Sequence, residues 1–311
     1  MFGHKFFFSF EFLKVTIKQL NFKRMAAKIL VTGATGTIGQ ALVKTLRERG
    51  LSFVAGVRNP AEGREKLAPD TPLTAFDFSK PETFESATQG VDRIFLLGPP
   101  MVPELADLLR SFIEFLKRKG IQRVVYLAAL GLEAIPELPL HQQTIDRLEA
   151  EGFDYTVLKP SFFSQNFKKY EWENITQRGV TFAVAGKGKA GFIDVDDIAN
   201  VAAEVLTTEG HAKKRYDLTG PELLSYYEVA DLLTEVTGKK IVYPEPSEDD
   251  FRQALQAAGV PDFVVSYMLN VYRLISEGHV GYLTDDVEKL TGKKPTSLKT
   301  VLAADFASVA S

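Results

Sequence analysis

The stretch KILVTGATGTIG at residues 28–39 decides the fold. It opens with the apolar run Lys28–Thr32, which predicts a short strand. A glycine-rich turn follows, and from Thr37 to Arg49 apolar residues recur at helical spacing. A strand, a glycine turn and a helix in this order are typical of the first unit of a dinucleotide-binding sheet. In such a unit the exposed N–H groups and the helix dipole hold a pyrophosphate.

Each glycine of this turn has a predicted task. Gly33 permits the tight turn, Gly36 lets a pyrophosphate approach the backbone without a Cβ in the way, and Gly39 lets the helix pack close to the strand. The spacing is GxxGxxG rather than the commoner GxGxxG, and alone it is a weak signal. The strand before it, the helix after it and the repeating units downstream make it specific, against the alternative of a glycine turn that binds nothing.

The rest of the first two-thirds of the chain alternates strands and helices. Strands are expected at 52–57, 73–76, 93–97, 124–128, 155–158 and 216–218. A helix is expected after the third strand, with Ser79 as its cap, and further helices are expected over 104–119, 141–150 and 196–206. This alternation predicts the α/β class, with a Rossmann-type doubly wound parallel sheet that carries helices on both faces.

Past Pro160 the pattern changes. An aromatic helix is expected over 161–178, followed by a glycine-rich loop at 186–191. Helices are expected to start at Ser225, Thr284 and Ser297, and Gly238 is expected to end one. We therefore expect a Rossmann domain over 25–220 and a smaller, mostly helical C-terminal lobe over 221–311, with residues 161–191 contributing to the substrate site.

Composition excludes several classes of function. The 311 residues include no cysteine, which rules out disulfides, thiolate catalysis and cysteine-ligated metals, and makes the cytoplasm the expected compartment. The four histidines show no metal spacing, so no metal is expected. The net charge of −3 gives no field that favours nucleic acid, and no apolar run is long enough to cross a membrane.

Residues 1–24 differ from the remainder. They carry five Lys/Arg, one Glu and seven Phe, and Met25 opens a natural start just before the first strand. We interpret them as an extension outside the fold. A targeting leader and an added edge strand are the alternatives, the latter because Phe8, Phe10 and Phe12 alternate with period two.

Further cofactor contacts are expected at the carboxyl ends of the next strands. Arg58 lies 19 residues after Gly39, where an acid would bind the ribose of NAD and an arginine suits the 2′-phosphate of NADP. This predicts that NADP(H) is preferred over NAD(H), unless Arg58 is a solvated surface residue. Asp77 is placed to meet adenine or to form a turn, and Gly98 either lets the cofactor pass or belongs to a plain loop.

The motifs together resemble a known family. VTGATGTIGQALV, GVRNP, GFDYTVLKPSFFSQNF, FIDVDDIANVAAEVL and YDLTGPE are similar to those of NmrA-like atypical short-chain dehydrogenases, in the branch that contains triphenylmethane reductase and NAD(P)H:quinone oxidoreductase. The resemblance implies that Gly33, Thr35, Gly36, Thr37 and Ile38 contact the pyrophosphate and Arg58 the 2′-phosphate. It also implies that Asp77 and Phe78 lie beside adenine, and that Leu97, Gly98 and Pro99 line the nicotinamide end. The chain departs from the family at Lys159, where arginine is common, and at Ile145, where glutamate is common.

Ordinary short-chain dehydrogenases use a Ser and a Tyr-x-x-x-Lys pair that this chain lacks. The fifth strand ends in Ala128-Ala129, and Glu137 and His141 occupy the Tyr and Lys positions. The string from Tyr155 to Lys159 matches the motif but falls on an expected strand, so we interpret it as accidental. His141 is the candidate catalytic residue, because an unperturbed histidine titrates near ~6.5 and can donate a proton. A packing role at the start of a helix is the alternative.

The missing hydroxyls favour acceptors that delocalise an incoming electron pair. Phe162, Phe163 and Phe167 follow the sixth strand and are expected either to stack a flat substrate or to pack in a core. The leading hypothesis is an NADPH-dependent reductase of quinones or similar aromatic acceptors. The alternative is a non-catalytic NADP(H)-binding redox sensor that docks on a protein partner. A sugar-nucleotide epimerase or a classical carbonyl reductase would need the absent Tyr-x-x-x-Lys helix.

Overall fold

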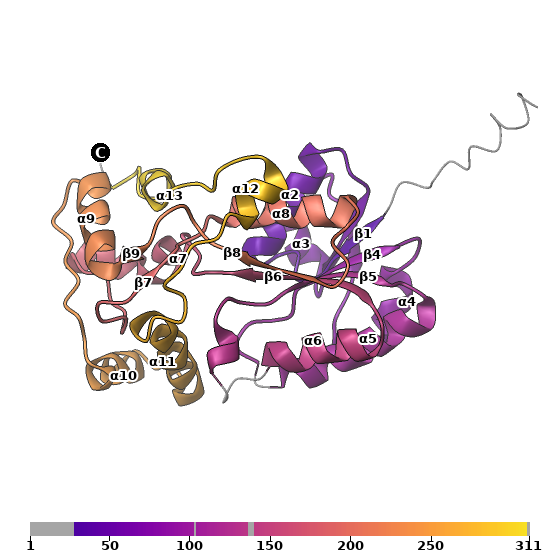
Figure 1. The fold of residues 1–311 in the computed structure, drawn as a ribbon, viewed down its shortest axis with the longest axis horizontal. Coiled ribbons are helices and arrows are strands. Elements are labelled where there is room, and N and C mark those ends of the chain that lie inside the picture. The colour runs from indigo at the N-terminus through magenta and orange to yellow at the C-terminus, as the bar shows by residue number, and fades with distance from the viewer. Residues whose placement is uncertain (1–27, 103, 136–139, 310–311) are drawn as a thin grey trace, which may run out of the picture.

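The computed structural model describes residues 28–102, 104–135 and 140–309, and Figure 1 shows their fold. Seven parallel strands form a sheet in the order β3-β2-β1-β4-β5-β6-β8. Their bounds are Ile29–Val31 (β1), Phe53–Val57 (β2), Leu73–Ala75 (β3), Arg93–Leu96 (β4), Arg123–Leu127 (β5), Asp154–Pro160 (β6) and Lys214–Leu218 (β8). The predicted Rossmann-type sheet is confirmed. Its order reverses between β1 and β4, which is the switch point where such sheets bind ligands.

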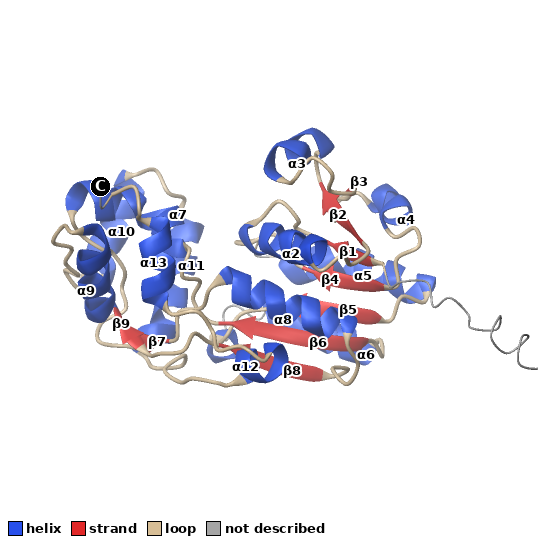
Figure 2. Ribbon diagram, turned by 90° about the horizontal axis from the view of Figure 1, so that it is seen from above, coloured by secondary structure: helices blue, strands red, loops and turns tan. Residues whose placement is uncertain are grey.

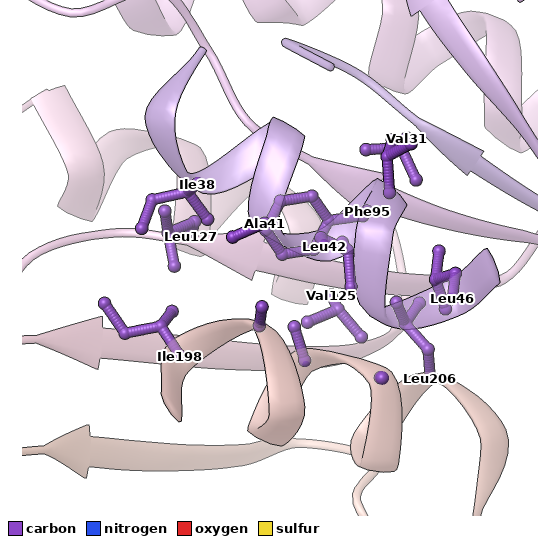
Figure 3. Close-up of a cluster of buried hydrophobic side chains, with 14 of the residues drawn as sticks. Val31, Ile38, Ala41, Leu42, Leu46, Phe95, Val125, Leu127, Ile198 and Leu206 are labelled. Carbon is purple, nitrogen blue, oxygen red and sulfur yellow. The ribbon is translucent and has the colours of Figure 1, made fainter. Parts of the chain in front are cut away.

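Helices cover both faces of the sheet (Figure 1). One face carries α4 (Phe84–Ala87), α5 (Leu105–Lys119) and α6 (Leu140–Ala150), and the other carries α2 (Thr37–Glu48) and α8 (Val195–Thr207). Successive strand residues point to opposite faces, so Leu30 packs on the first side and Val31 on the second. Figure 3 shows Ile38 and Leu42 of α2 in one buried cluster with Leu127 of β5 and Ile198 of α8.

The C-terminal lobe lies at the carboxyl ends of the strands (Figure 2). Its helices are α7 (Asn166–Glu173) with a π-helical turn at Asn174–Arg178, α9 (Tyr226–Thr237), α10 (Glu248–Ala257), α11 (Asp262–Ser276) and α13 (Leu298–Asp305). A small antiparallel pair, β7 (Lys189–Ala190) and β9 (Leu224–Ser225), joins them. The lobe has its own buried cluster, whereas α12 (Asp286–Thr291) returns to α8 and buries Val287 in the core of the sheet.

Two of the predicted helix starts are wrong. Ser79 caps no helix: its N–H and hydroxyl donate to the Asp77 carboxylate, and a 3-10 turn at Pro81–Thr83 leads into α4 instead. Thr284 precedes α12 by two residues, because its hydroxyl donates to the backbone carbonyl of Asp217. The expected helix over 161–178 begins only at Asn166.

Other predicted ends are confirmed. The hydroxyls of Ser225 and Ser297 cap α9 and α13, and Gly238 ends α9 in the left-handed region with φ +68°. A helix at Pro60–Lys66 (α3) and the β7–β9 pair were not predicted.

Some predictions fall where the structure says nothing, or are not tested by it. Those for residues 1–24 and for Glu137 lie outside the described residues. Within the described ranges, no helix is both long and apolar enough to span a bilayer, and no three His, Asp or Glu side chains form a group that would hold a metal ion. The division at residue 220 stays a prediction.

Candidate functional site

The three glycines after β1 are required for three different physical reasons. Gly33 has φ +62°, a conformation that favours glycine. A Cβ on Gly39 would lie 2.1 Å from the carbonyl oxygen of Gly33, so any side chain there would push α2 off the turn. Gly36 has φ −79°, and a Cβ on it would meet only the Gly33 oxygen at 3.3 Å. Neither backbone geometry nor close protein packing accounts fully for Gly36, which leaves space on the exposed side of the turn for a ligand.

The amino end of α2 is open to an anion. Gly36 occupies the N-cap position and no side chain caps the helix, whereas Asp194 caps α8 with its carboxylate. The first N–H groups of a helix have no partner within it and carry the positive end of the helix dipole. At Thr37 and Ile38 these groups sit beside the exposed Gly36. The arrangement therefore fits the pyrophosphate of a dinucleotide.

A buried threonine joins the turn to the end of β4. The Thr32 hydroxyl donates to the carbonyls of Phe95 and Leu97 at 3.1 and 3.0 Å and accepts the N–H of Leu97 at 2.8 Å. These bonds hold the loop Leu97-Gly98-Pro99 beside the glycine turn. A Cβ on Gly98 would lie 2.5 Å from the side chain of Leu105, so packing on α5 is one reason for this glycine.

Arg58, Asp77 and Phe78 come to the same edge from β2 and β3. Arg58 is exposed at the end of β2, and in the described part of the chain no carboxylate forms a salt bridge with it. Asp77 accepts the N–H and hydroxyl of Ser79 at 2.9 and 2.7 Å, and these bonds, with Lys80 and Arg58 nearby, lower the pKa of its carboxyl. The ring of Phe78 packs edge-on against Phe76 at 4.8 Å. The Arg58 guanidinium therefore lies near the Asp77 carboxylate without a salt-bridge partner among the described residues.

His141 lies in the first turn of α6, and a tyrosine on β5 fixes its ring. Its Nδ1 is 2.6 Å from the hydroxyl of Tyr126, which also has a hydrogen bond with Thr144. A neutral histidine whose Nδ1 accepts this hydrogen bond carries its proton on Nε2. In that tautomer the Nε2–H of His141 is a donor.

Burial lowers the pKa of His141 to about 4. The expectation that it titrates near its ordinary value is therefore wrong, because the imidazolium would be desolvated at this position. At neutral pH the side chain is neutral, and it can donate one hydrogen bond but cannot act as a charged acid.

A cavity of about 100 Å³ lies in front of His141. Its lining residues are Ala128, Ala129, Glu133, His141, Gln142, Ile145, Lys159 and Arg215. Ala128 and Ala129 follow β5, so the cavity lies at the carboxyl edge of the sheet and receives no hydroxyl from that strand.

Lys159 also lines this cavity, and sequence reasoning missed it. It lies on β6, so the predicted strand position of the Tyr155–Lys159 string is confirmed. Its ammonium is 2.8 Å from Asp217 and 3.1 Å from Glu133. Burial alone would lower the pKa of Lys159, but these two carboxylates raise it above the ordinary value. Only the fold could reveal this, since β8 brings Asp217 next to Lys159 in register.

The three candidate phenylalanines have different surroundings. Phe162 and Phe163 are half-buried, and the ring of Phe162 stacks on Tyr272 with centroids 6.5 Å apart. Phe167 is only 2% exposed and packs against Phe192 and Tyr226 in the core of the lobe. Phe162 and Phe163 are therefore more accessible than Phe167.

Comparisons with known proteins agree with this geometry. A family model described as NAD(P)H-binding matches residues 33–209. An NAD(P)H azoreductase from Xenophilus azovorans is 33% identical over 270 residues, which cover 85% of this chain and 93% of the relative. The crystal structure of an NADPH-dependent quinone oxidoreductase from Escherichia coli with NADPH aligns with TM-score 0.81 and 28% identity, covering 89% of this chain and 99% of that one. A triphenylmethane reductase from Citrobacter aligns with TM-score 0.80 and 27% identity, covering 90% and 99%.

Proposed function

The chain belongs to the NAD(P)H-binding family, as an oxidoreductase related to quinone oxidoreductase and azoreductase, and on that premise we propose that it transfers hydride from NADPH to a quinone or a similarly flat, conjugated acceptor. The observation that carries the proposal is how poorly the residues lining the cavity at the end of β5 can donate a proton. Ala128 and Ala129 offer no hydroxyl there, and His141 is neutral. The proton of Lys159 is held by two carboxylates.

Such a site is poorly equipped to protonate a simple ketone. An acceptor that spreads the incoming electron pair over a conjugated system needs less proton donation, and its reduction depends mainly on contact with the nicotinamide. Quinones, azo compounds and triarylmethyl cations share this property. The names of the azoreductase, the quinone oxidoreductase and the triphenylmethane reductase describe acceptors of this kind.

The residues present fit the dinucleotide. Bound NADPH would supply the hydride. Gly33, Thr35, Gly36, Thr37 and Ile38 would hold its pyrophosphate, Asp77 and Phe78 would flank adenine, and Leu97, Gly98 and Pro99 would line the nicotinamide end. Arg58 would bind the 2′-phosphate, and its lack of a salt-bridge partner among the described residues supports a preference for NADPH.

On the acceptor side, His141 and two aromatic residues would orient the substrate. The Nε2–H of His141 would donate a hydrogen bond to an oxygen of the acceptor, with the Tyr126 hydroxyl fixing the tautomer. Phe162 and Phe163 would contact the ring face. Phe167 would support them from the core of the lobe.

Steady-state oxidation of NADPH, followed by its near-ultraviolet absorbance, tests the proposal. The acceptor panel contains a benzoquinone, a naphthoquinone, an azo dye, a triphenylmethane dye and a simple ketone as the negative control. We expect turnover with at least one conjugated acceptor and none with the ketone. Tight NADPH binding without turnover of any acceptor would favour the alternative, a non-catalytic redox sensor with a protein partner. Turnover of the ketone alone would contradict the argument from the missing hydroxyls.

A further inference from the structure

A lysine from α7 reaches across to the glycine turn. The Nζ of Lys169 lies 3.2 Å from the Oγ1 of Thr37, the first residue of α2, although 132 residues separate them in the chain. Helix α7 follows β6 and packs in the core of the C-terminal lobe through Phe167. An ammonium group from the lobe therefore stands at the amino end of α2.

Two hydrogen bonds hold α7 in this position. The amide of Gln165, just before the helix, donates to Asp194 at 2.7 Å and accepts the N–H of Val195 at 3.2 Å. Asp194 and Val195 begin α8, which packs along α2. The place of Lys169 relative to the turn is thus set by the contact between the two helices and by the anchor at Gln165.

The charge of Lys169 is not neutralised in the described part of the chain. No carboxylate there lies within salt-bridge distance of it, whereas its neighbour Lys168 pairs with Asp305 at 3.2 Å. The ring of Tyr170 lies 5.0 Å from the Lys169 ammonium and offers only a cation–π contact. A cation beside a helix amino end opposes the positive end of the dipole, and an anion bound beside both groups would offset this repulsion.

We propose that Lys169 binds the cofactor pyrophosphate from the side of α7, so that the dinucleotide is held by both parts of the chain. The inference rests on the proposed function, because it takes NADPH as the ligand. It assigns Lys169 to the phosphates that NADPH and NADH share, and Arg58 to the phosphate that only NADPH carries. The two residues therefore differ in what their loss does to the choice between the cofactors.

Calorimetric titration with NADPH and with NADH, without any acceptor, tests the assignment. We expect Lys169→Met to weaken both cofactors by about tenfold at low salt, the range for loss of one partly exposed charge-assisted hydrogen bond. The loss should shrink at high salt because exposed charges are screened. Lys169→Arg should retain most of the affinity. Lys168→Met, one residue away on the same helix, is the matched control and should bind both cofactors as the wild type does.

The outcomes separate this inference from the proposed function. If the wild type binds neither cofactor, the proposed function fails. If the wild type binds NADPH and Lys169→Met binds it equally well, the role of Lys169 in binding the pyrophosphate is refuted while the proposed function stands. If Lys169→Met weakens NADPH but leaves NADH unchanged, Lys169 contacts the 2′-phosphate and the assignment is wrong. Because Lys169 is exposed, we expect the variant to fold, and its thermal midpoint without ligand checks this.

Discussion

Ionisation of Glu171 should make the stability of this protein depend on pH. Glu171 lies on α7, and its carboxyl is buried in the C-terminal lobe. One oxygen accepts the Thr181 hydroxyl at 2.6 Å and the N–H of Phe182 at 2.7 Å. Burial raises the pKa of Glu171 to about 7 from an ordinary 4.5, although these two hydrogen bonds act in the opposite direction.

The groups around Glu171 do not compensate its charge. Within the described ranges, the titratable side chains that interact with it are Tyr226, Tyr243 and Tyr272, and burial raises the pKa of each. They stay neutral over the range in which Glu171 ionises. The neutral carboxyl is therefore the form that the fold accommodates, and the carboxylate would be desolvated without a salt bridge to any described residue.

The size of the effect follows from the two pKa values. The folded state holds the proton more tightly than the unfolded chain, so the stabilisation is complete below pH 4.5 and is lost as the pH rises through about 7. Between pH 5 and pH 8 this one group should lower the free energy of unfolding by about 2.5 kcal/mol. Glu171→Gln keeps an amide oxygen for Thr181 and Phe182 but cannot ionise. The free energy of unfolding of this variant should therefore not show this decrease between pH 5 and pH 8.

Urea unfolding followed by tryptophan fluorescence measures the difference. Trp172 is the only tryptophan in the chain, and it adjoins Glu171 and stacks on Phe306 in the same lobe. The matched control is Glu173→Gln on the same helix, where the side chain is exposed. Its pH dependence should parallel that of the wild type. If Glu171→Gln also parallels the wild type from pH 5 to pH 8, Glu171 is not the buried acid that the reasoning requires.

Three further predictions concern the candidate site. Gly36→Ala should abolish NADPH binding in calorimetry and leave the stability of the free protein nearly unchanged. Gly39→Ala should also lower the free energy of unfolding by about 1–3 kcal/mol, because its Cβ would meet the Gly33 carbonyl. Arg58→Ala should remove a preference for NADPH over NADH of at least about tenfold, and equal affinities in the wild type would contradict it. His141→Ala should lower quinone turnover by about three- to tenfold with little change in NADPH affinity. The wild-type rate should show no titration of His141 between pH 5.5 and pH 8, because the pKa of His141 is about 4.

The sheet was predictable because its signals are local. Apolar strand runs and the glycine turn place β1, β2, β4 and β5 within one or two residues of where they lie. The φ of Gly33 and the contact at Gly39 bear out the tight turn and the close helix packing expected of them. The similarity to the quinone oxidoreductase and the triphenylmethane reductase also confirms the branch inferred from the motifs.

What the sequence could not supply depends on competing local hydrogen bonds and on long-range contacts. Ser79 reads as a helix cap by type, but the Asp77 carboxylate two residues earlier takes its hydrogen bonds. The neutral state of His141 comes from burial against Tyr126 on another element. Lys159 gains its ion pair only when β8 pairs with β6. The glycine-rich loop at 186–191 gave no sign of its packing, yet a Cβ on Gly188 would lie 1.9 Å from the backbone of Ile275.

Helix α7 links the stability of the lobe to the cofactor site. Toward the core it buries Glu171 and Phe167, and toward α2 it presents Lys169. A ligand that binds only the folded protein stabilises the folded state by mass action. Bound NADPH, in contact with Lys169, should therefore oppose any displacement of α7 caused by ionisation of Glu171. By linkage, ionisation of Glu171 should weaken NADPH binding only to the extent that it displaces α7. Lys169→Met would break this connection, because the cofactor would then have lost its contact with α7. The pH dependence of NADPH affinity should accordingly be smaller in Lys169→Met than in the wild type, and an unchanged pH dependence would show that the lobe and the cofactor site are thermodynamically independent.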